Sequence, residues 1–137
     1  MHQIFLIQLV VSAFMTGFVW FAQIVHYPLL LKIGPESFGE YQKENLIRSA
    51  GVAIPIMCIE GITAFSLVYL LSSSVSILNL SLLILIWIST ATLQAPRHLS
   101  LQKEFDKESI GTLIRLNWIR TVLWTGRTVL LCSTLLA

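Results

Sequence analysis

The chain has 137 residues, of which 55% are hydrophobic and only 12% are charged, and its formal net charge is +2. A soluble domain of this length cannot hide so much apolar surface, because small domains have a high ratio of surface to volume. The small net charge gives no indication of a nucleic-acid partner. The composition therefore predicts a lipid bilayer as the partner, and the length allows one transmembrane domain, residues 1–137, with four spans of ~20 residues each.

Four apolar runs follow one another along the chain, at about 4–25, 50–71, 75–93 and 116–137. Each run is long enough to cross ~30 Å of hydrocarbon as a helix, and a helix satisfies every backbone amide inside the segment. The N-terminus lacks the basic region of a signal peptide, so the first run is predicted to be a retained span. We therefore expect an all-α integral membrane four-helix bundle.

The charged residues are distributed very unevenly. Apart from Glu60 and Arg127, all of them lie in residues 32–48 and 97–120, whereas the turn at 72–74 between spans two and three has none. Cytoplasmic loops of membrane proteins carry an excess of Lys and Arg. We therefore predict a multi-pass protein of the cell membrane with both charged segments in the cytoplasm and both termini outside.

The two charged segments also contain helix signals. The first begins with Pro35, which suits the first turn of a helix, and continues with Phe38 and Tyr41 at helical spacing. In the second, Asp106 is a suitable N-cap ahead of Ile110. These patterns predict short interfacial helices between spans 1 and 2 and between spans 3 and 4.

The chain repeats itself at a gap-free shift of 72 residues. At this shift His26 falls on His98, and residues 45–49 fall on residues 117–121 with Asn, Ile and Arg identical. The shift predicts two tandem repeats, about 1–72 and 73–137. Since each repeat holds two spans, both enter the membrane in the same direction, and a pseudo-two-fold axis along the membrane normal should relate them.

Two opposite charges lie deep in the predicted spans. Glu60 is twelve residues past Arg48 and Arg127 is seven past Arg120, which places them ~18 Å and ~10 Å along their helices. A lone charge at this depth is costly, so we expect the two to pair or to share a polar cavity. A salt bridge that only fixes helix register and a substrate or proton site both remain open.

Polar and aromatic side chains recur on one face of the first and the fourth span, from Thr16 to His26 and from Asn117 to Cys132. Lipid-facing helices do not carry such stripes, so they predict a polar, Trp-lined pocket in the cytoplasmic half of the bundle. Cys58 and Cys132 form no C-x-x-C pair and are interpreted as buried thiols.

His26 and His98 allow three interpretations. They could bind a metal or a haem, act in the pocket as a base or hydrogen-bonding group, or simply lie at the membrane interface. The chain has no H-x-x-x-H or Glu-x-x-His spacing. We therefore expect no cofactor and keep a metal or haem held by His26 and His98 as the alternative.

Two motifs resemble a known family. The stretch Gln94-Ala-Pro96-Arg-His98-Leu-Ser-Leu101, followed by Asn117-Trp118-Ile-Arg120-Thr121-Val-Leu-Trp124, resembles the anthrone oxygenase-like family of small four-helix membrane proteins. The similarity covers most of the chain. It implies cofactor-free oxidation of a lipophilic, anthrone-like substrate, in which a base removes a proton and the resulting enolate reacts with O₂.

The resemblance also implies roles for residues. The candidate catalytic residues are His98 or His26 as the base, with Arg120 and Asn117 stabilising the oxyanion. The candidate substrate-binding residues are Trp20, Gln23, Asn45, Arg48, Glu60, Gln94, Trp124 and Arg127. Two other functions remain open, a bundle that binds or transports a lipophilic molecule such as a quinone without chemistry, and an accessory subunit of a membrane complex. A homo-oligomer is also open.

Overall fold

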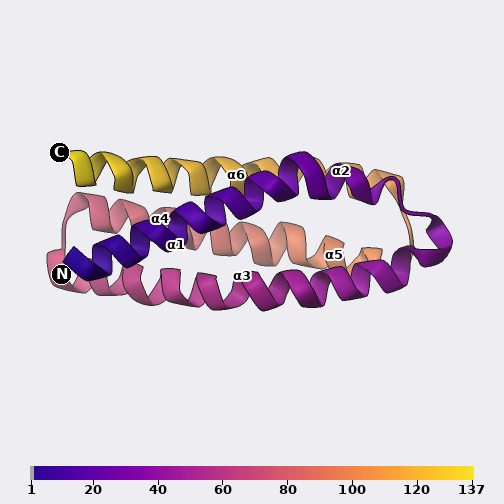
Figure 1. Ribbon diagram of the computed structural model, residues 1–137, viewed down its shortest axis with the longest axis horizontal. Coiled ribbons are helices and arrows are strands. Elements are labelled where there is room, and N and C mark those ends of the chain that lie inside the picture. The colour runs from indigo at the N-terminus through magenta and orange to yellow at the C-terminus, as the bar shows by residue number, and fades with distance from the viewer. Residues whose placement is uncertain (1) are drawn as a thin grey trace.

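The computed structural model describes residues 2–137 as four helical rods that lie side by side, with no strand in that range (Figure 1). The prediction of an all-α fold is confirmed. Two rods are interrupted by π-helical turns. In chain order the elements are α1 (His2–Phe21), η1 (Ala22–His26), α2 (Tyr27–Leu30), α3 (Pro35–Leu71), α4 (Ser74–Ser89), η2 (Thr90–Gln94), α5 (Ala95–Leu101) and α6 (Lys107–Leu136).

Three rods, His2–Leu30, Pro35–Leu71 and Ser74–Leu101, are long and apolar enough to cross a membrane. This finding is consistent with the predicted helical membrane protein. The fourth rod, α6, is interrupted by polar side chains, but it packs against α1 and α4 along the bundle. Its outward side chains are apolar, as Val122 and Val129 show with more than half of their surface exposed.

The two cysteines lie on the outer surface of the bundle, Cys58 on α3 and Cys132 on α6. Cys58 and Cys132 are both exposed, so the prediction of buried thiols was wrong. In a membrane bundle the side that faces away from the core is apolar as well, and therefore an apolar run does not by itself indicate which of its residues are buried.

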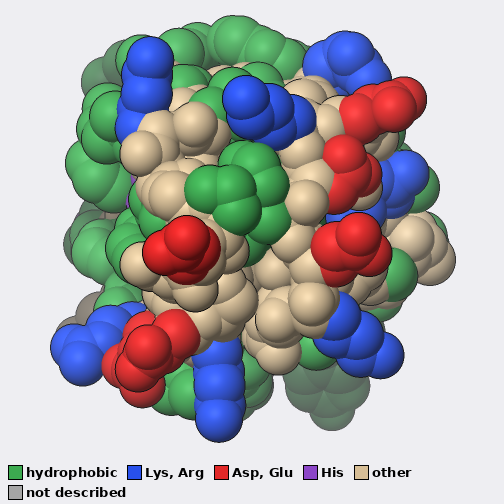
Figure 2. Space-filling view, turned by 90° about the vertical axis from the view of Figure 1, so that its right-hand side faces the viewer, with side chains coloured by type: hydrophobic (Ala, Val, Ile, Leu, Met, Phe, Trp, Pro, Cys, Tyr) green, Lys and Arg blue, Asp and Glu red, His purple; other side chains and the backbone are tan. Residues whose placement is uncertain are grey.

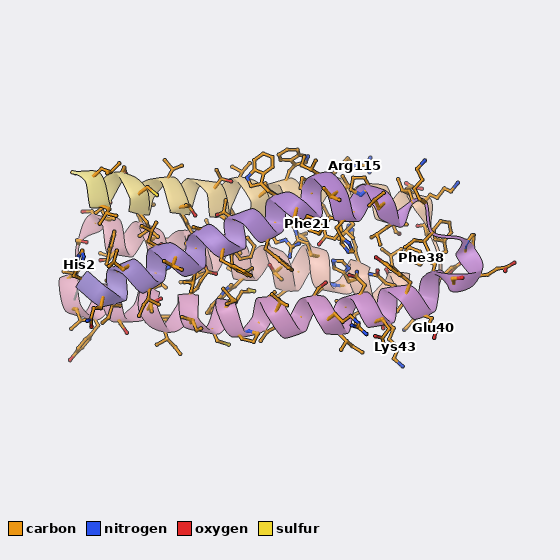
Figure 3. All side chains as sticks on the ribbon, viewed as in Figure 1. His2, Phe21, Phe38, Glu40, Lys43 and Arg115 are labelled. Atoms are coloured by element: carbon orange, nitrogen blue, oxygen red, sulfur yellow. The ribbon has the colours of Figure 1, made fainter. Side chains whose placement is uncertain are left out.

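The two ends of the bundle are built differently. His2, Leu136 and the turn at 72–73 lie at one end, which we call the terminal end. The loops 31–34 and 102–106 lie at the other, which we call the charged end. Figure 2 views the charged end and shows acidic and basic side chains across it, and Figure 3 places Glu40 and Lys43 there, far from His2. The two charged segments thus meet at one end.

Two predicted helix starts are confirmed. Pro35 is the first residue of α3. The Asp106 side chain caps α6 by accepting hydrogen bonds from the backbone N–H groups of Glu108 at 3.0 Å and Ser109 at 3.1 Å. Hydrogen bonds from the Ser109 side chain and from these N–H groups lower the pKa of Asp106, which keeps the cap charged.

The short helices predicted to begin at Pro35 and after Asp106 are not separate elements in residues 2–137. α3 runs unbroken from the charged end to Leu71, and α6 from Lys107 to Leu136. Residues 35–48 are therefore the first part of α3 and residues 107–120 the first part of α6, whereas residues 97–101 belong to α5. A break would leave backbone amides and carbonyls without partners at the membrane boundary, whereas a continuous helix satisfies them.

The order of elements is the same in both halves of the chain. Each half has a helix, a π turn, a short helix with a proline at its second position, a loop and a long helix. The 72-residue shift aligns the starts of α3 and α6. It does not align the π turns, because both α5 and the loop 102–106 are longer than α2 and the loop 31–34.

Candidate functional site

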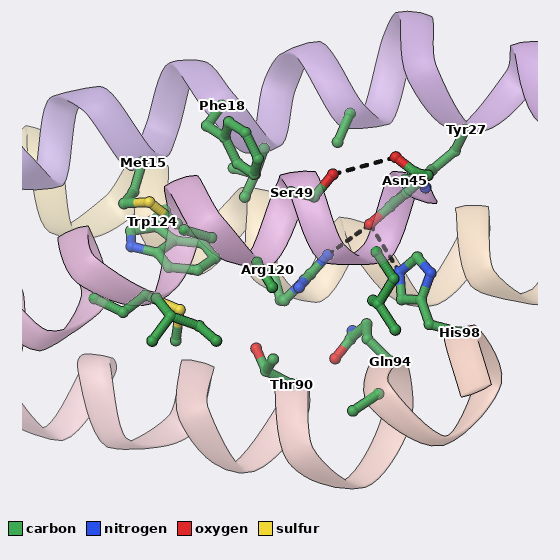
Figure 4. A pocket seen from close by; sticks show the side chains of 18 residues that line it. Met15, Phe18, Tyr27, Asn45, Ser49, Thr90, Gln94, His98, Arg120 and Trp124 are labelled. Atoms are coloured by element: carbon green, nitrogen blue, oxygen red, sulfur yellow. Dashed lines mark hydrogen bonds between the residues drawn. The ribbon is translucent and has the colours of Figure 1, made fainter. Parts of the chain in front are cut away.

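A cavity of about 250 Å³ lies in the half of the bundle next to the charged end, which we call the charged half (Figure 4). Its walls come from all four rods. The apolar wall includes Met15, Phe18, Val19, Ala53, Met57 and Trp124. The polar residues in the wall are Tyr27, Asn45, Ser49, Thr90, Gln94, His98 and Arg120.

Both π turns contribute to this cavity. Ala22 of η1 and Thr90 and Gln94 of η2 lie in its wall. Pro28 and Pro96 come shortly after the π turns, and because proline has no N–H to donate, a regular helical ladder is already interrupted there. Such turns are frequent at functional sites.

The Tyr27 hydroxyl is the centre of the polar group at the charged end of the cavity. Tyr27 Oη lies 3.2 Å from His98 Nε2 and accepts a hydrogen bond from Arg120 Nη2 at 3.0 Å. The Tyr27 ring centroid is 5.6 Å from the ring centroids of both His26 and His98. Tyr27 therefore joins the two histidines and Arg120 into one cluster.

The amide of Gln42 fixes the proton on His98. Gln42 Oε1 accepts from Asn45 Nδ2 at 3.3 Å, so Gln42 Nε2 donates to His98 Nδ1 at 2.9 Å. A neutral imidazole carries one N–H, which must then be on Nε2 and donate to Tyr27. Since a phenol oxygen accepts two hydrogen bonds and donates one, the Tyr27 proton is left for a further acceptor.

This bonding bears on the proposed roles of His98. Both of its ring nitrogens are taken, so His98 offers no nitrogen to a metal or a haem and none that could accept a substrate proton directly. Within residues 2–137 no three His, Cys, Asp or Glu side chains are close enough together to hold a metal ion. The geometry instead makes His98 the residue that positions Tyr27.

Arg120 is held only by neutral oxygen atoms. Its Nε and Nη2 donate to Asn117 Oδ1 at 2.9 and 2.5 Å, and Asn117 Nδ2 donates to Gln23 Oε1 at 2.9 Å. No carboxylate among residues 2–137 lies within ion-pair distance of Arg120. A positive charge without a counter-ion therefore lines an apolar cavity.

The next arginine along α6 is bonded differently. Arg127 Nη1 lies 2.7 Å from Glu60 Oε1, and both side chains are fully buried, which confirms the predicted pairing. Trp124 Nε1 donates to the two Glu60 oxygens at 3.1 and 3.2 Å, and Arg127 Nε donates to Asn79 Oδ1 at 3.2 Å. Trp124 thus connects the ion pair to the wall of the cavity.

Two predicted site residues lie outside the bundle core. Trp20 is 39% exposed and donates to Thr125 Oγ1 at 3.0 Å. Arg48 is exposed and pairs with Glu44 at 3.1 Å, which lets its charge reach water beyond the helix surface. Neither contributes to the cavity wall, which corrects their prediction as pocket residues.

The other predicted residues fall into three groups. Those in the cavity wall are His98, Asn45, Gln94, Arg120 and Trp124. Those buried behind the wall or in the ion pair are Gln23, Asn117, Glu60 and Arg127. His26 stands alone, because it contacts the Tyr27 ring but does not line the cavity.

Three polar residues of these networks were missing from the sequence prediction. Tyr27 stands directly between His26 and Pro28. Gln42 precedes Asn45 by three residues and therefore shares its helix face. Asn79 is the amide within the third apolar run, and a buried amide at membrane depth is itself a sign of a polar partner.

Known proteins provide no further identification of the site. No protein-family model, no curated protein and no solved structure matches the chain. The resemblance to the anthrone oxygenase-like family therefore stays a prediction, and the function is argued from the cavity and its charges.

Proposed function

We propose that the chain is a multi-pass protein of the cell membrane that binds a lipophilic aromatic molecule in the cavity through a negatively charged oxygen. The observation that supports this proposal is Arg120, whose guanidinium lines the cavity and has only neutral partners. Charges inside a membrane protein are normally paired or functional. A bound enolate or phenolate would supply the missing counter-charge.

The polar groups of the wall fit the same ligand. The Tyr27 proton is free to donate, and Arg120 Nη1 forms no hydrogen bond with any described residue. Both groups are donors, so they suit an oxygen acceptor. The rest of the wall is apolar and includes the Trp124 indole, which suits aromatic rings.

A binding role is also better supported than that of an accessory subunit. The polar stripe of α6 faces the interior of the chain's own bundle, where Asn117, Thr121, Trp124 and Arg127 are all buried. A subunit that used this stripe for a partner would need it on the surface.

The proposed topology has α6 as the fourth span, the charged end in the cytoplasm and both termini outside, with the two halves related by a two-fold axis along the membrane normal. The Lys and Arg residues of the charged end support this orientation. A reporter fused after Ala137 that is active only outside the cytoplasm should give a signal. A reporter that is active only inside should be silent, and the opposite result would reverse the orientation.

The binding proposal is tested with purified protein and a hydroxyanthrone, whose enolate carries the required oxygen. Arg120→Gln should weaken binding about 10- to 100-fold, because hydrogen bonds to charged groups contribute ~1.5–3 kcal/mol. Quenching of tryptophan fluorescence measures the affinity. Arg115→Gln is the matched control, since Arg115 lies on the same helix but is exposed and bonds only to Thr112.

Anthracene, which has the same rings and no oxygen, separates charge recognition from apolar burial. It should bind more weakly than the hydroxyanthrone and with equal affinity to the parent protein and Arg120→Gln. Equal affinities of the hydroxyanthrone for the parent and Arg120→Gln would contradict the proposal.

Cofactor-free oxidation of the bound molecule is the second candidate function, favoured by the same pair of donors. Groups that stabilise an enolate oxygen promote loss of the ring-carbon proton. The ring-carbon proton passes to water as the enolate forms. The carbanion adds O₂, the peroxide anion takes a proton from water to give a hydroperoxide, and loss of water leaves a carbonyl. One oxygen atom thus enters the product and the other leaves as water. An oxygen electrode should record O₂ uptake with the hydroxyanthrone that chelators do not inhibit and that Arg120→Gln reduces.

A further inference from the structure

The Glu60–Arg127 pair is connected to the cavity of the charged half by the Trp124 side chain. Neither charged side chain belongs to the cavity wall, whereas Trp124 does. The Trp124 indole donates from Nε1 to both Glu60 oxygens, at 3.1 and 3.2 Å, and it forms no other hydrogen bond to residues 2–137. A role of the pair in ligand binding would therefore be exercised through this indole.

The backbone at Trp124 is fixed without the ion pair. Its carbonyl accepts a hydrogen bond from Thr16 Oγ1 of α1 at 3.0 Å, and α6 packs against both α1 and α4. The side chain differs, because its packing neighbours in the core are apolar, among them Met15 and Ile86, and the hydrophobic effect has no preferred direction. The two bonds to Glu60 are therefore the only directional contacts of the indole.

The indole lies between the carboxylate and a cavity of about 250 Å³. Figure 4 shows the indole nitrogen on the edge of the ring that lies away from Arg120. A side chain that borders a cavity gains dispersion contacts when it turns into that cavity, and a change between staggered rotamers allows such a turn. Without its bonds to Glu60, the Trp124 indole can therefore occupy the space in which a ligand would bind.

We propose that Glu60 is a positioning residue, which keeps the cavity open by holding the Trp124 indole in the wall. A carboxylate suits this role, because a hydrogen bond to a charged acceptor is about twice as strong as one to a neutral acceptor. A buried carboxylate needs a counter-ion, which Arg127 supplies at 2.7 Å. This inference rests on the proposed binding function, since it concerns the same cavity. The pair then serves ligand binding as well as the contact between α3 and α6.

Two double variants without charges isolate the bond to the indole. Glu60→Gln with Arg127→Leu keeps an oxygen that can accept from Trp124, whereas Glu60→Leu with Arg127→Leu does not. Both variants lose the ion pair, so its contribution to stability is absent from the comparison. The double variant with Glu60→Gln should bind a hydroxyanthrone about 2- to 10-fold more tightly, as one neutral hydrogen bond predicts. Isothermal titration calorimetry measures both affinities.

The same comparison with Trp124→Phe added shows whether Glu60 acts through the indole. Phenylalanine has no N–H to donate, so in this background the two double variants should bind the hydroxyanthrone equally. Trp87→Phe is the matched control, because Trp87 packs against the same core cluster but its Nε1 has no acceptor within residues 2–137. With Trp87→Phe the difference in affinity should persist. Equal affinities with Trp124 in place, or an undiminished difference with Trp124→Phe, would overturn the proposal.

Nuclear magnetic resonance of the full chain in detergent micelles tests the same bond without a ligand. With ¹⁵N in tryptophan, and signals assigned by Trp124→Phe and Trp87→Phe, the Trp124 indole proton should resonate downfield of the Trp87 proton, because a bond to a carboxylate deshields it. The signal should stay downfield with Glu60→Gln and move upfield with Glu60→Leu.

The two measurements separate the two proposals. A Trp124 indole signal at the same position in both double variants would overturn the role of Glu60, even if the parent protein binds the hydroxyanthrone. Failure of the parent protein to bind would contradict the proposed function, and the indole signal alone would then decide whether Glu60 positions Trp124.

Discussion

Two arginines on one face of α6 differ in their burial and in their bonding partners. Arg127 is fully buried and paired with a carboxylate at 2.7 Å. Arg120, two helical turns earlier, lines the cavity and bonds only to Asn117 and Tyr27. The comparison shows that the chain neutralises the charge of Arg127 and leaves that of Arg120 without a carboxylate partner, which is the basis on which we propose Arg120 as the group that binds a ligand.

The difference originates on α3. At the level of Arg127 this helix presents Glu60 to the interior. At the level of Arg120 it presents the neutral side chains of Asn45 and Ser49. Its own arginine, Arg48, points outward. The charge of Arg120 is therefore left over because α3 carries no acid on its inner face there.

The largest effect should come from breaking the ion pair on one side. Arg127→Leu leaves the Glu60 carboxylate buried without a counter-ion, which should lower the free energy of unfolding by about 3–5 kcal/mol. The double variant Glu60→Leu with Arg127→Leu should be more stable than Arg127→Leu alone. Thermal unfolding in detergent measures both, and additive losses would show that the two charges are not coupled.

The packing around the pair gives the next largest effect. A Cβ at Gly61 would lie 2.7 Å from Cη2 of the Trp87 indole, so α3 and α4 are in close contact beside Glu60. Gly61→Ala should cost about 1–3 kcal/mol through overpacking. Gly51→Ala, on the same helix with no atom within 4 Å of the new Cβ, should be neutral or stabilising by up to ~1 kcal/mol.

The smallest effect concerns the cluster around Arg120. Tyr27→Phe removes the acceptor of the His98 Nε2 proton but leaves Arg120 bonded to Asn117. The free energy of unfolding should fall by about 0.5–1.5 kcal/mol. The free energy of binding a hydroxyanthrone should weaken by a similar amount. Tyr69→Phe is the control, because Tyr69 is 87% exposed and should show neither loss. If Tyr27→Phe also behaves like the parent, Tyr27 does not bind the ligand.

The sequence predicts the parts of this molecule that depend on local patterns. Apolar runs identify the rods, helix signals identify Pro35 and Asp106 as starts, and the cost of a lone charge predicts that Glu60 and Arg127 pair. These predictions require only that other helices are present, and not where those helices lie.

The π turns explain why Tyr27 could not be predicted. A stripe from Thr16 to His26 assumes a regular helix of 3.6 residues per turn. The π turn η1 ends at His26 and shifts the helical phase of the residues after it. As a result Tyr27 takes the place in the cavity that the regular spacing gives to His26.

Arg48 and Arg120 show the limit of the 72-residue match in the sequence. Arg48 and Arg120 are equivalent at this shift. However, Glu44 stands four residues before Arg48 and pairs with it on the surface, whereas Leu116 stands four residues before Arg120. The outward arginine thus has an acid four residues away on its own helix face, and the arginine in the cavity wall has none.

The turn between α3 and α4 divides the molecule into two parts with two rods each. Only Ser72 and Ser73 lie outside helices there, and His2 and Leu136 lie at the same end, so a cut at this turn would break no rod. Glu60 would then belong to one fragment and Arg127 to the other. Each two-helix fragment would carry one buried charge without a counter-ion, which the other fragment supplies. Separately translated fragments should therefore assemble as an obligate heterodimer through this ion pair.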